Sequence, residues 1–388
     1  MKYRALTLAL LLAGVSAPAM AGYLTRAEVK NQNEVFQQWW ADDFEWKFDE
    51  LPIEGKVDKQ RMPYAGYIYP DKVGGCANCL RKYDRAFNRR GRSAAAHERH
   101  DIAIHKDKVE RRGGLFGWRT VTRMDTPDWA GHCNGWVCAS IRHAEPKRTV
   151  YRNGVAFTPA DIKGLLAEMY VYNNTITLDS EGGDIVDAAS LHVVLANWLG
   201  RGKHPVGADI SPGKEVWNYP IYGYSSAAAK RGARRVEVRT NVGYVYMLDQ
   251  EHHIAPKNNR FLQFHYMLYL DSEGRVVGGD YMADSDRIDM LWAPRKLSPS
   301  GSEGNRNGNP HVDTETVLAM WRESASEEAR LTWWNIDPTE QDRIVSDEEA
   351  NPIEAPVLEE ELAEEVHPAG ETNEERAEAG DYPTTDAA

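Results

Sequence analysis

The segment Trp129–Ile141 places a cysteine between a glycine turn and a predicted helix. The first backbone N–H groups of a helix and the positive end of its dipole stabilise a thiolate. We therefore expect Cys133, which follows the turn at Gly131, to be a nucleophile whose pKa is lowered from about 8.5 toward neutrality. The competing interpretation is a small buried side chain or one half of a disulfide.

An export signal is predicted at residues 1–21. It has a basic start, an apolar run at residues 5–15 and the small residues Ala19 and Ala21 before a cleavage site. The run is too short to span a bilayer, and no later stretch reaches the ~20 apolar residues of a membrane helix. We expect a secreted or periplasmic protein that begins at Gly22 and has no membrane span.

Acidic charge is concentrated at the C-terminus. Residues 347–388 contain 15 acidic residues against one arginine, so they account for the whole net charge of −13. The rest of the chain is nearly neutral and gives no electrostatic reason to expect nucleic acid as a partner. The tail has too few apolar residues to pack, and residues 346–388 are predicted to be disordered.

The chain between the signal and the tail, about 320 residues, is long enough for one large domain. In residues 22–60, aromatic side chains from Phe36 to Phe48 recur at helical spacing, which predicts an N-terminal helical segment and a candidate pro-region. Residues 61–335 are predicted to be a catalytic domain of the α+β class. It combines a helix over residues 159–170, capped by Thr158, with a β-rich stretch over residues 236–290.

Residues 80–113 are rich in arginine and lysine and are predicted to be an irregular, solvated connecting segment. They include the sequence His97-Glu98-Arg99-His100. The zinc-protease motif needs histidines four residues apart on one helix face, and these are three apart. We therefore do not expect a metal site from this motif.

The four cysteines allow three disulfide connectivities. Cys76 and Cys79 lie beside a glycine turn and could close a small loop, which would leave Cys133 and Cys138 as thiols. A zinc site with four cysteines is disfavoured, because Cys133 and Cys138 are five residues apart rather than two to four.

Cys133 is followed along the chain by His192 and Asp209. Acyl transfer needs a nucleophile, an imidazole that moves its proton and a third group that orients the imidazole. The order Cys–His–Asp is shared by papain-like proteases and transglutaminases. Residues 191–210 fit either a hairpin or a helix ending at Gly200, and in both cases we expect His192 and Asp209 to come together.

Several motifs over residues 60–325 carry a family resemblance. They are Trp129-x-Gly131-x-Cys133-x-Gly135-Trp136, Arg148-x-Val150-x-x-Asn153-Gly154-Val155-x-Phe157, Leu191-His192-Val193-x-Leu195-Ala196-Asn197, Val216–Tyr224 and Tyr269–Tyr281. Together they resemble the oomycete-type transglutaminase elicitor family, which implies a secreted, bacterial member. Val216–Tyr224 is similar to the surface peptide that plants recognise in that family, but four of its residues differ: Tyr219, Ile221, Tyr222 and Tyr224.

The resemblance implies a papain-like, transglutaminase-core fold with an antiparallel sheet and flanking helices. It also implies a protein-glutamine γ-glutamyltransferase that links glutamine side chains to lysine or other amines through a thioester on Cys133. His192 would protonate the departing ammonia, and Asp209 would hold the imidazole in the right tautomer. The expected partners are proteins that bear glutamine and lysine, or small amines. Calcium (Ca2+) is implied as a cofactor, with the acidic loops at residues 179–187 and 280–289 as candidate sites.

Two other functions fit the same residues. A papain-like endopeptidase would use the same three side chains, with water resolving the acyl-enzyme. A non-catalytic secreted interaction protein would have Cys133 locked in a disulfide with Cys138 or with the Cys76/Cys79 pair.

Overall fold

The computed structural model describes residues 22–88, 91–114, 117–124, 126–179, 185–326 and 328–329. The predicted signal at residues 1–21 and the predicted disordered tail at residues 346–388 lie outside these ranges. Within the ranges, no helix combines the length and the apolar character needed to cross a membrane.

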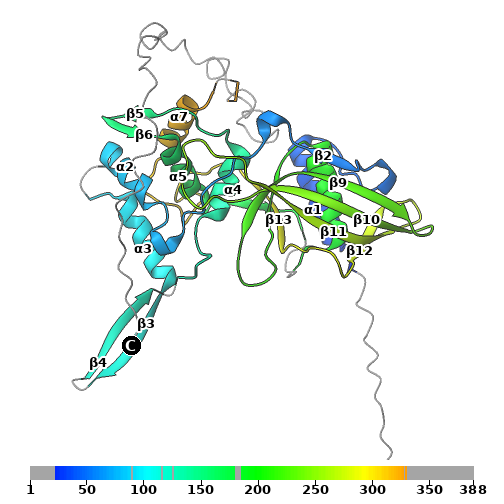
Figure 1. Cartoon of the computed structure of the whole chain (residues 1–388), viewed down its shortest axis with the longest axis horizontal. Coiled ribbons are helices and arrows are strands. Elements are labelled where there is room, and N and C mark those ends of the chain that lie inside the picture. Colours follow the sequence, from blue (N-terminus) through cyan, green and yellow to red (C-terminus); the bar gives the residue numbers. More distant parts are fainter. Residues whose placement is uncertain are drawn as a thin grey trace, which may run out of the picture. The chain divides into compact units, whose positions relative to one another are not determined.

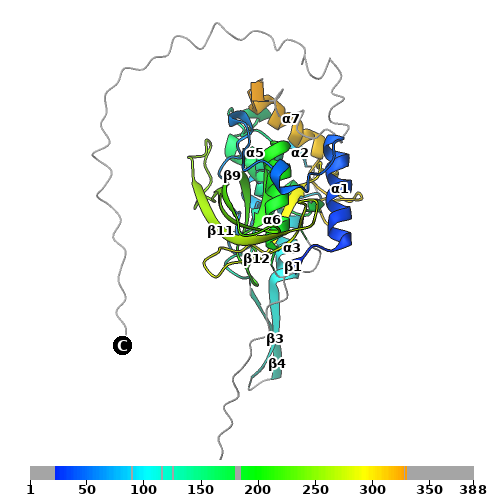
Figure 2. The same cartoon turned by 90° about the vertical axis from the view of Figure 1, so that its right-hand side faces the viewer.

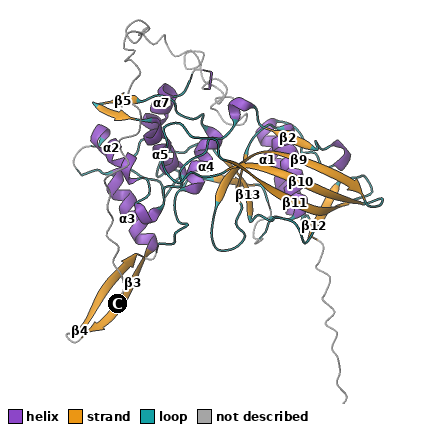
Figure 3. Ribbon diagram, viewed as in Figure 1, coloured by secondary structure: helices purple, strands orange, loops and turns teal. Residues whose placement is uncertain are grey.

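Helices and strands alternate irregularly along the described chain, as expected for the α+β class (Figure 3). The α-helices are α1 (Arg26–Trp40), α2 (Ala77–Phe87), α3 (Ala94–Lys106), α4 (Cys133–Arg142), α5 (Pro159–Tyr170), α6 (Ala188–Val194) and α7 (Thr314–Ser324). Short 3-10 turns are η1 (Phe48–Glu50), η2 (Lys59–Arg61) and η3 (Asp71–Val73), and the π-helical turn η4 (Leu195–Arg201) continues α6.

The strands form one large antiparallel sheet and two hairpins (Figure 1). They are β1 (Gly22–Tyr23), β2 (Glu54–Lys56), β3 (Asp107–Gly114), β4 (Gly117–Met124), β5 (Val150–Arg152), β6 (Val155–Phe157), β7 (Thr175–Thr177), β8 (Val206–Asp209), β9 (Asn218–Lys230), β10 (Arg235–Val245), β11 (Asn259–Leu270), β12 (Val276–Tyr281) and β13 (Met290–Pro294). The order in the large sheet is β1-β12-β11-β10-β9-β8-β13-β7, and β2 pairs with β9 beside this path. The hairpins are β3–β4 and β5–β6.

The helix predicted over residues 159–170 is confirmed as α5. The Thr158 side chain accepts a hydrogen bond from the backbone N–H of Asp161, and the Asp161 carboxylate accepts one from the backbone N–H of Thr158. This capping box satisfies two of the N–H groups that a helix N-terminus leaves without partners.

The predicted N-terminal helix is confirmed as α1 as far as Trp40. It ends there because Ala41 adopts a left-handed conformation, with a φ of 53°. The prediction that the helix continues to Phe48 is wrong, because the chain turns before Phe44 and packs this ring edge-on against Phe36.

The helix α6 and its continuation η4 cover one face of the sheet at β9, β11 and β12. Next to them lies α1, whose Trp39 and Trp40 rings contact the Trp198 ring of η4 at centroid distances of 5.3 and 4.8 Å. Figure 2 shows the sheet, α6 and α1 as successive layers. Apolar side chains from all three layers belong to one core.

Residues 22–60 supply two strands of the sheet. Gly22 and Tyr23 in β1 pair with β12, and β2 pairs with residues 223–225 of β9. The buried rings of Phe36 and Trp39 belong to the same core as the rest of the described chain. The role of this segment as a pro-region and the boundary at residue 60 stay predictions.

The prediction that residues 80–113 form an irregular connecting segment is wrong. They contain most of α2, all of α3 and most of β3. The apolar positions of α2 are spaced to bury Leu80 and Tyr83 on one face, while the arginines and lysines lie on the other. The high density of charge hid this amphipathic pattern.

Candidate active site

The glycines of the Trp129–Ile141 segment set the position of Cys133. A Cβ at Gly131 would lie 2.7 Å from the carbonyl oxygen of Ile68, and a Cβ at Gly135 would lie 2.1 Å from that of Ala167. Side chains at either position would therefore collide with backbone. The helix α4 begins at Cys133 as predicted, and the missing side chain of Gly135 lets it pack closely against α5.

The sulfur of Cys133 faces the start of β9. The Nδ2 amide of Asn218 donates to Sγ at 3.6 Å, and Sγ lies 3.7 Å from the carbonyl oxygen of Val216. The Oδ1 atom of Asn218 accepts a hydrogen bond of 3.0 Å from Trp292 Nε1, which fixes the orientation of the amide. Cys133 is 6% exposed, so it lies just under the surface beside the exposed Val216.

Burial raises the pKa of the Cys133 thiol above its usual value. Hydrogen bonds from the side chain and backbone of Asn218 and from the backbone of Asn134 lower this pKa, and the charge of Asp209 raises it. The expectation of a pKa near neutrality is therefore wrong for this state. The helix N-terminus does stabilise the thiolate, but loss of solvent outweighs it.

Asp209, the last residue of β8, holds the loop that lies over Cys133. Its Oδ1 atom accepts the backbone N–H groups of Ser211 and Trp217 at 3.1 and 2.9 Å. It also stands opposite Asn218 in the β8–β9 pairing. The structure thus places Asp209 near Cys133, with its carboxylate bound to the backbone of the loop at residues 211–217 rather than to His192.

His192 lies elsewhere, on α6. Its Nδ1 atom is 2.8 Å from the hydroxyl of Tyr266, and its ring stacks on Phe48 at 5.6 Å. Burial lowers the pKa of His192 to about 4, so the imidazole is neutral. The hairpin alternative for residues 191–210 is wrong, since the helical alternative forms. The structure brings Asp209 and Cys133 near each other but gives His192 other partners, and the catalytic role of His192 stays a prediction.

The segment that resembles the elicitor peptide forms the loop and the first half of β9. Its four differing residues are all buried: Tyr219, Ile221, Tyr222 and Tyr224. The resemblance led us to expect a surface peptide, but this strand is internal to the sheet, between β8 and β10. Its contribution to the site is the placement of Val216 and Asn218 against Cys133.

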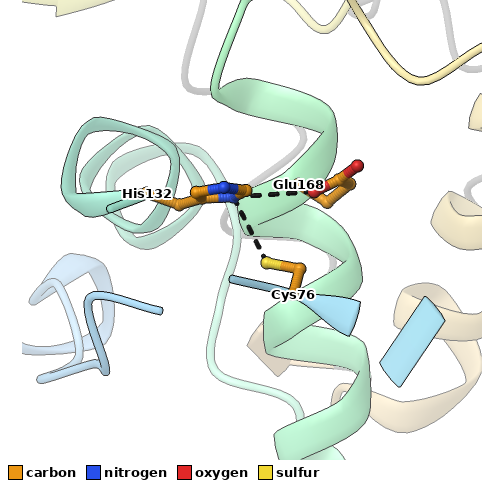
Figure 4. Close-up of side chains that lie close together, drawn as sticks. All are labelled: Cys76, His132 and Glu168. Carbon is orange, nitrogen blue, oxygen red and sulfur yellow. Dashed lines mark hydrogen bonds and ion pairs between the residues drawn. The ribbon is translucent and has the colours of Figure 1, made fainter. Parts of the chain in front are cut away.

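A second group of reactive side chains was missed by sequence reasoning. Cys76, His132 and Glu168 lie together, with one ligand atom of each within 4.8 Å of the others. Figure 4 shows Cys76 and Glu168 pointing at the same His132 ring. In the parts of the chain that the structure describes, no other three histidine, cysteine or acidic residues meet this criterion.

Two further carboxylates lie on the other side of the His132 ring. Nε2 is 3.1 Å from Glu98 Oε1 and 3.6 Å from Asp71 Oδ1. Burial lowers the pKa of His132, but the charges of Glu98, Glu168 and Asp71 outweigh this and raise it to about 9. Burial and the charge of Glu98 raise the pKa of Glu168. These residues come from α3, α5 and the turns before α2 and α4.

The spacing Cys76-x-x-Cys79 was the one sequence signal for this group. Glu98 lay in the segment predicted to be a solvated connection, and nothing in the sequence ties Glu168 to it. All four cysteines are free thiols, and the Cys79 sulfur donates to the backbone oxygen of Cys76 at 3.1 Å. A Cys76–Cys79 disulfide, one of the connectivities that the sequence left open, is therefore not formed in the structure, nor is a bond between Cys133 and Cys138.

The acidic loops named as calcium sites use their carboxylates within the protein. Asp179 accepts the backbone N–H of Leu291, and Asp187 caps α6. Asp280 accepts the backbone N–H of Gly22 and the hydroxyl of Tyr269. Residues 180–184 lie outside the described chain. Calcium binding stays a prediction.

Comparisons with known proteins relate the chain to transglutaminases. The family model described as "Transglutaminase elicitor" matches residues 111–238. The crystal structure of the GP42 transglutaminase from Phytophthora sojae is similar at 21% identity and a TM-score of 0.59, over 78% of this chain and 98% of that chain. A comparison with curated proteins finds no match. The α+β fold of this chain, with its curled antiparallel sheet and flanking helices, is therefore a transglutaminase-like fold.

Proposed function

We propose that the protein is a glutamine-directed cysteine acyltransferase with Cys133 as its nucleophile. The observation that carries this proposal is the position of Cys133 as the first residue of α4, with the oriented amide of Asn218 donating to its sulfur. The transglutaminase-like fold and the match at residues 111–238 support the same class of reaction.

In the proposed reaction the Cys133 sulfur attacks the side-chain carbonyl carbon of a glutamine. The thiol proton passes to the amide nitrogen, the bond between this nitrogen and the carbonyl carbon breaks, and ammonia leaves as the thioester forms. A lysine amine or another amine then displaces the cysteine and forms the new amide bond. The Asn218 amide is a donor for the oxyanion, and loss of one such donor costs about 3 kcal/mol of transition-state stabilisation.

Two steps of the reaction require movement from this arrangement. The substrate reaches Cys133 when the loop at residues 211–217 shifts, since Val216 and its neighbours cover the sulfur. For His192 to carry a proton to the leaving group, its ring would have to leave Tyr266 and Phe48 and approach Cys133. Asp209 then acts by holding the loop as well as by orienting the imidazole.

The test is incorporation of a fluorescent amine into casein, with and without a calcium chelator. We expect Cys133→Ala to lose activity at least about 100-fold. Cys138→Ala is the matched control, because Cys138 is a buried cysteine on the same helix that makes no contact with Asn218 in the described chain, and it should keep activity. Equal activity in both variants would refute Cys133 as the nucleophile.

The same assay separates the alternatives. If casein is cleaved and no amine is incorporated, the protein is an endopeptidase rather than an acyltransferase. His192→Ala and Asp209→Ala are measured in parallel. If the His192→Ala variant keeps its activity, the His192 imidazole is not part of the mechanism, although Cys133 can still be the nucleophile. Loss of activity with chelator would support the proposed calcium requirement.

We also propose that the chain is exported. The mass of the protein recovered from the periplasm or the medium should correspond to a start at Gly22, which follows the predicted signal. Protein that stays in the cell with residues 1–21 attached would refute export.

A further inference from the structure

The His132 ring separates two sets of acceptors. Nδ1 faces the Cys76 sulfur at 3.3 Å and Glu168 Oε2 at 3.5 Å, while Nε2 faces Glu98 and Asp71. All five side chains are buried, and each is 5% exposed or less. One buried imidazole therefore faces three carboxylates and a thiol. Buried charges of this kind are stable when they are paired or coordinate a metal.

The two oxygens of the Glu168 carboxylate have different surroundings. Its Oε1 atom accepts a hydrogen bond of 2.7 Å from Asn309, which fixes the carboxylate. Its Oε2 atom is buried and accepts no hydrogen bond of normal geometry, and it lies 3.5 Å from His132 Nδ1, close enough for an ion pair (Figure 4). Cys76 ends at the same point, since its sulfur lies within reach of Nδ1 (Figure 4). A sulfur, a nitrogen and an oxygen thus converge.

We propose that Cys76 Sγ, His132 Nδ1 and Glu168 Oε2 bind one Zn2+ ion, with a water molecule as the fourth ligand. Ligands about 2.0–2.3 Å from zinc at tetrahedral angles are about 3.4–3.6 Å apart. The two separations around Nδ1, 3.3 and 3.5 Å, are close to this spacing, and the sulfur of Cys76 and the carboxylate oxygen of Glu168 lie within 4.8 Å of each other. On binding, the thiol of Cys76 and the charged ring of His132 each release one proton to bulk water, the latter from Nδ1, and zinc takes the place of these protons between the three atoms.

The donor set selects the metal. Calcium and magnesium take oxygen ligands, so a thiolate and an imidazole disfavour both. Zinc accepts sulfur, nitrogen and oxygen together.

The surroundings supply the supporting contacts that zinc ligands usually have. Nε2 of His132 faces Glu98 at 3.1 Å, the carboxylate–histidine–metal arrangement that fixes the tautomer with Nδ1 free to bind. Glu98 in turn accepts the backbone N–H of Cys76. The ion would tie the start of α2 to α5 and to His132, the residue before Cys133. Zinc would thereby anchor the beginning of α4.

The test measures metal content, so its outcome does not depend on the proposed acyltransferase activity. The full chain is purified with reduced thiols, incubated with zinc sulfate, dialysed and analysed by mass spectrometry for metals. We expect about one zinc per chain. Cys76→Ser and Glu168→Gln should each reduce the zinc content at least fivefold. Cys79→Ser is the matched control, a buried cysteine one turn away that should retain zinc.

A second measurement guards against variants that fail to fold. Cobalt added to the metal-free wild type should give a sulfur-to-cobalt charge-transfer band, and zinc should raise its Tm by about 5 °C. The proposal is overturned if the reduced wild type binds no zinc, if Cys76→Ser retains it, or if Cys79→Ser loses it. A Cys76–Cys79 disulfide found in the native protein would overturn it as well.

Discussion

The neutral, buried His192 predicts a loss of stability in mild acid. Burial lowers the pKa of His192 to about 4 in the folded protein, against 6.5 for an ordinary histidine. Between these values the unfolded chain binds a proton that the folded chain does not, so stability falls as the pH falls. The shift is worth about 3 kcal/mol in full, and about 2 kcal/mol between pH 7 and pH 5.

The assay is urea unfolding of the wild type and of His192→Gln at pH 7 and pH 5. The glutamine keeps a polar group for Tyr266 but does not titrate. We expect the wild type to lose about 2 kcal/mol more than the variant between the two pH values, because every other group cancels in the difference. If both proteins lose the same free energy of unfolding between pH 7 and pH 5, the pKa of His192 is not lowered in the folded protein. This result would refute the description of His192 as a buried, neutral side chain.

Three further substitutions follow from the packing. Gly135→Ala places a Cβ 2.1 Å from the oxygen of Ala167 and should lower the free energy of unfolding by about 3 kcal/mol, measured by urea unfolding. Thr158→Ala removes the capping box of α5 and should cost about 1 kcal/mol in the same assay, and no change would mean that the cap is dispensable. Asp209→Ala frees the loop over Cys133, so iodoacetamide should modify this thiol several-fold faster in the folded protein. An unchanged rate would show that the loop does not limit access.

Local signals in the sequence predicted elements whose stability is local. The cap at Thr158 and the glycine turn before Cys133 depend only on residues close by in the sequence, and α5 and α4 begin where we expected. For the charged segment that forms α2 and α3, local signals did not predict the helices. Its helices are stabilised by what they pack against, and the apolar positions that matter are few among the arginines and lysines.

Of the three predicted site residues, the structure places Asp209 opposite Asn218, which contacts Cys133, and the catalytic roles of all three stay predictions. The order of His192 in the chain matched the expected triad, but α6 directs its ring to Tyr266 and Phe48. Side chains far apart in sequence meet through packing, which chain order does not encode. The same limitation hid Glu168 and its partner Cys76, which are brought together by the contact of α2 with α5.

The strands contributed by residues 22–60 limit how far the chain can be shortened for recombinant production. A gene that begins at residue 61 would remove β1 from β12 and β2 from β9, and would strip Trp39 and Trp40 from the ring of Trp198. Unpaired strand edges beside newly exposed aromatic rings are sites of aggregation, because other copies of the chain can pair with the strands and pack on the rings. Such a product should collect in inclusion bodies, whatever its catalytic residues can do.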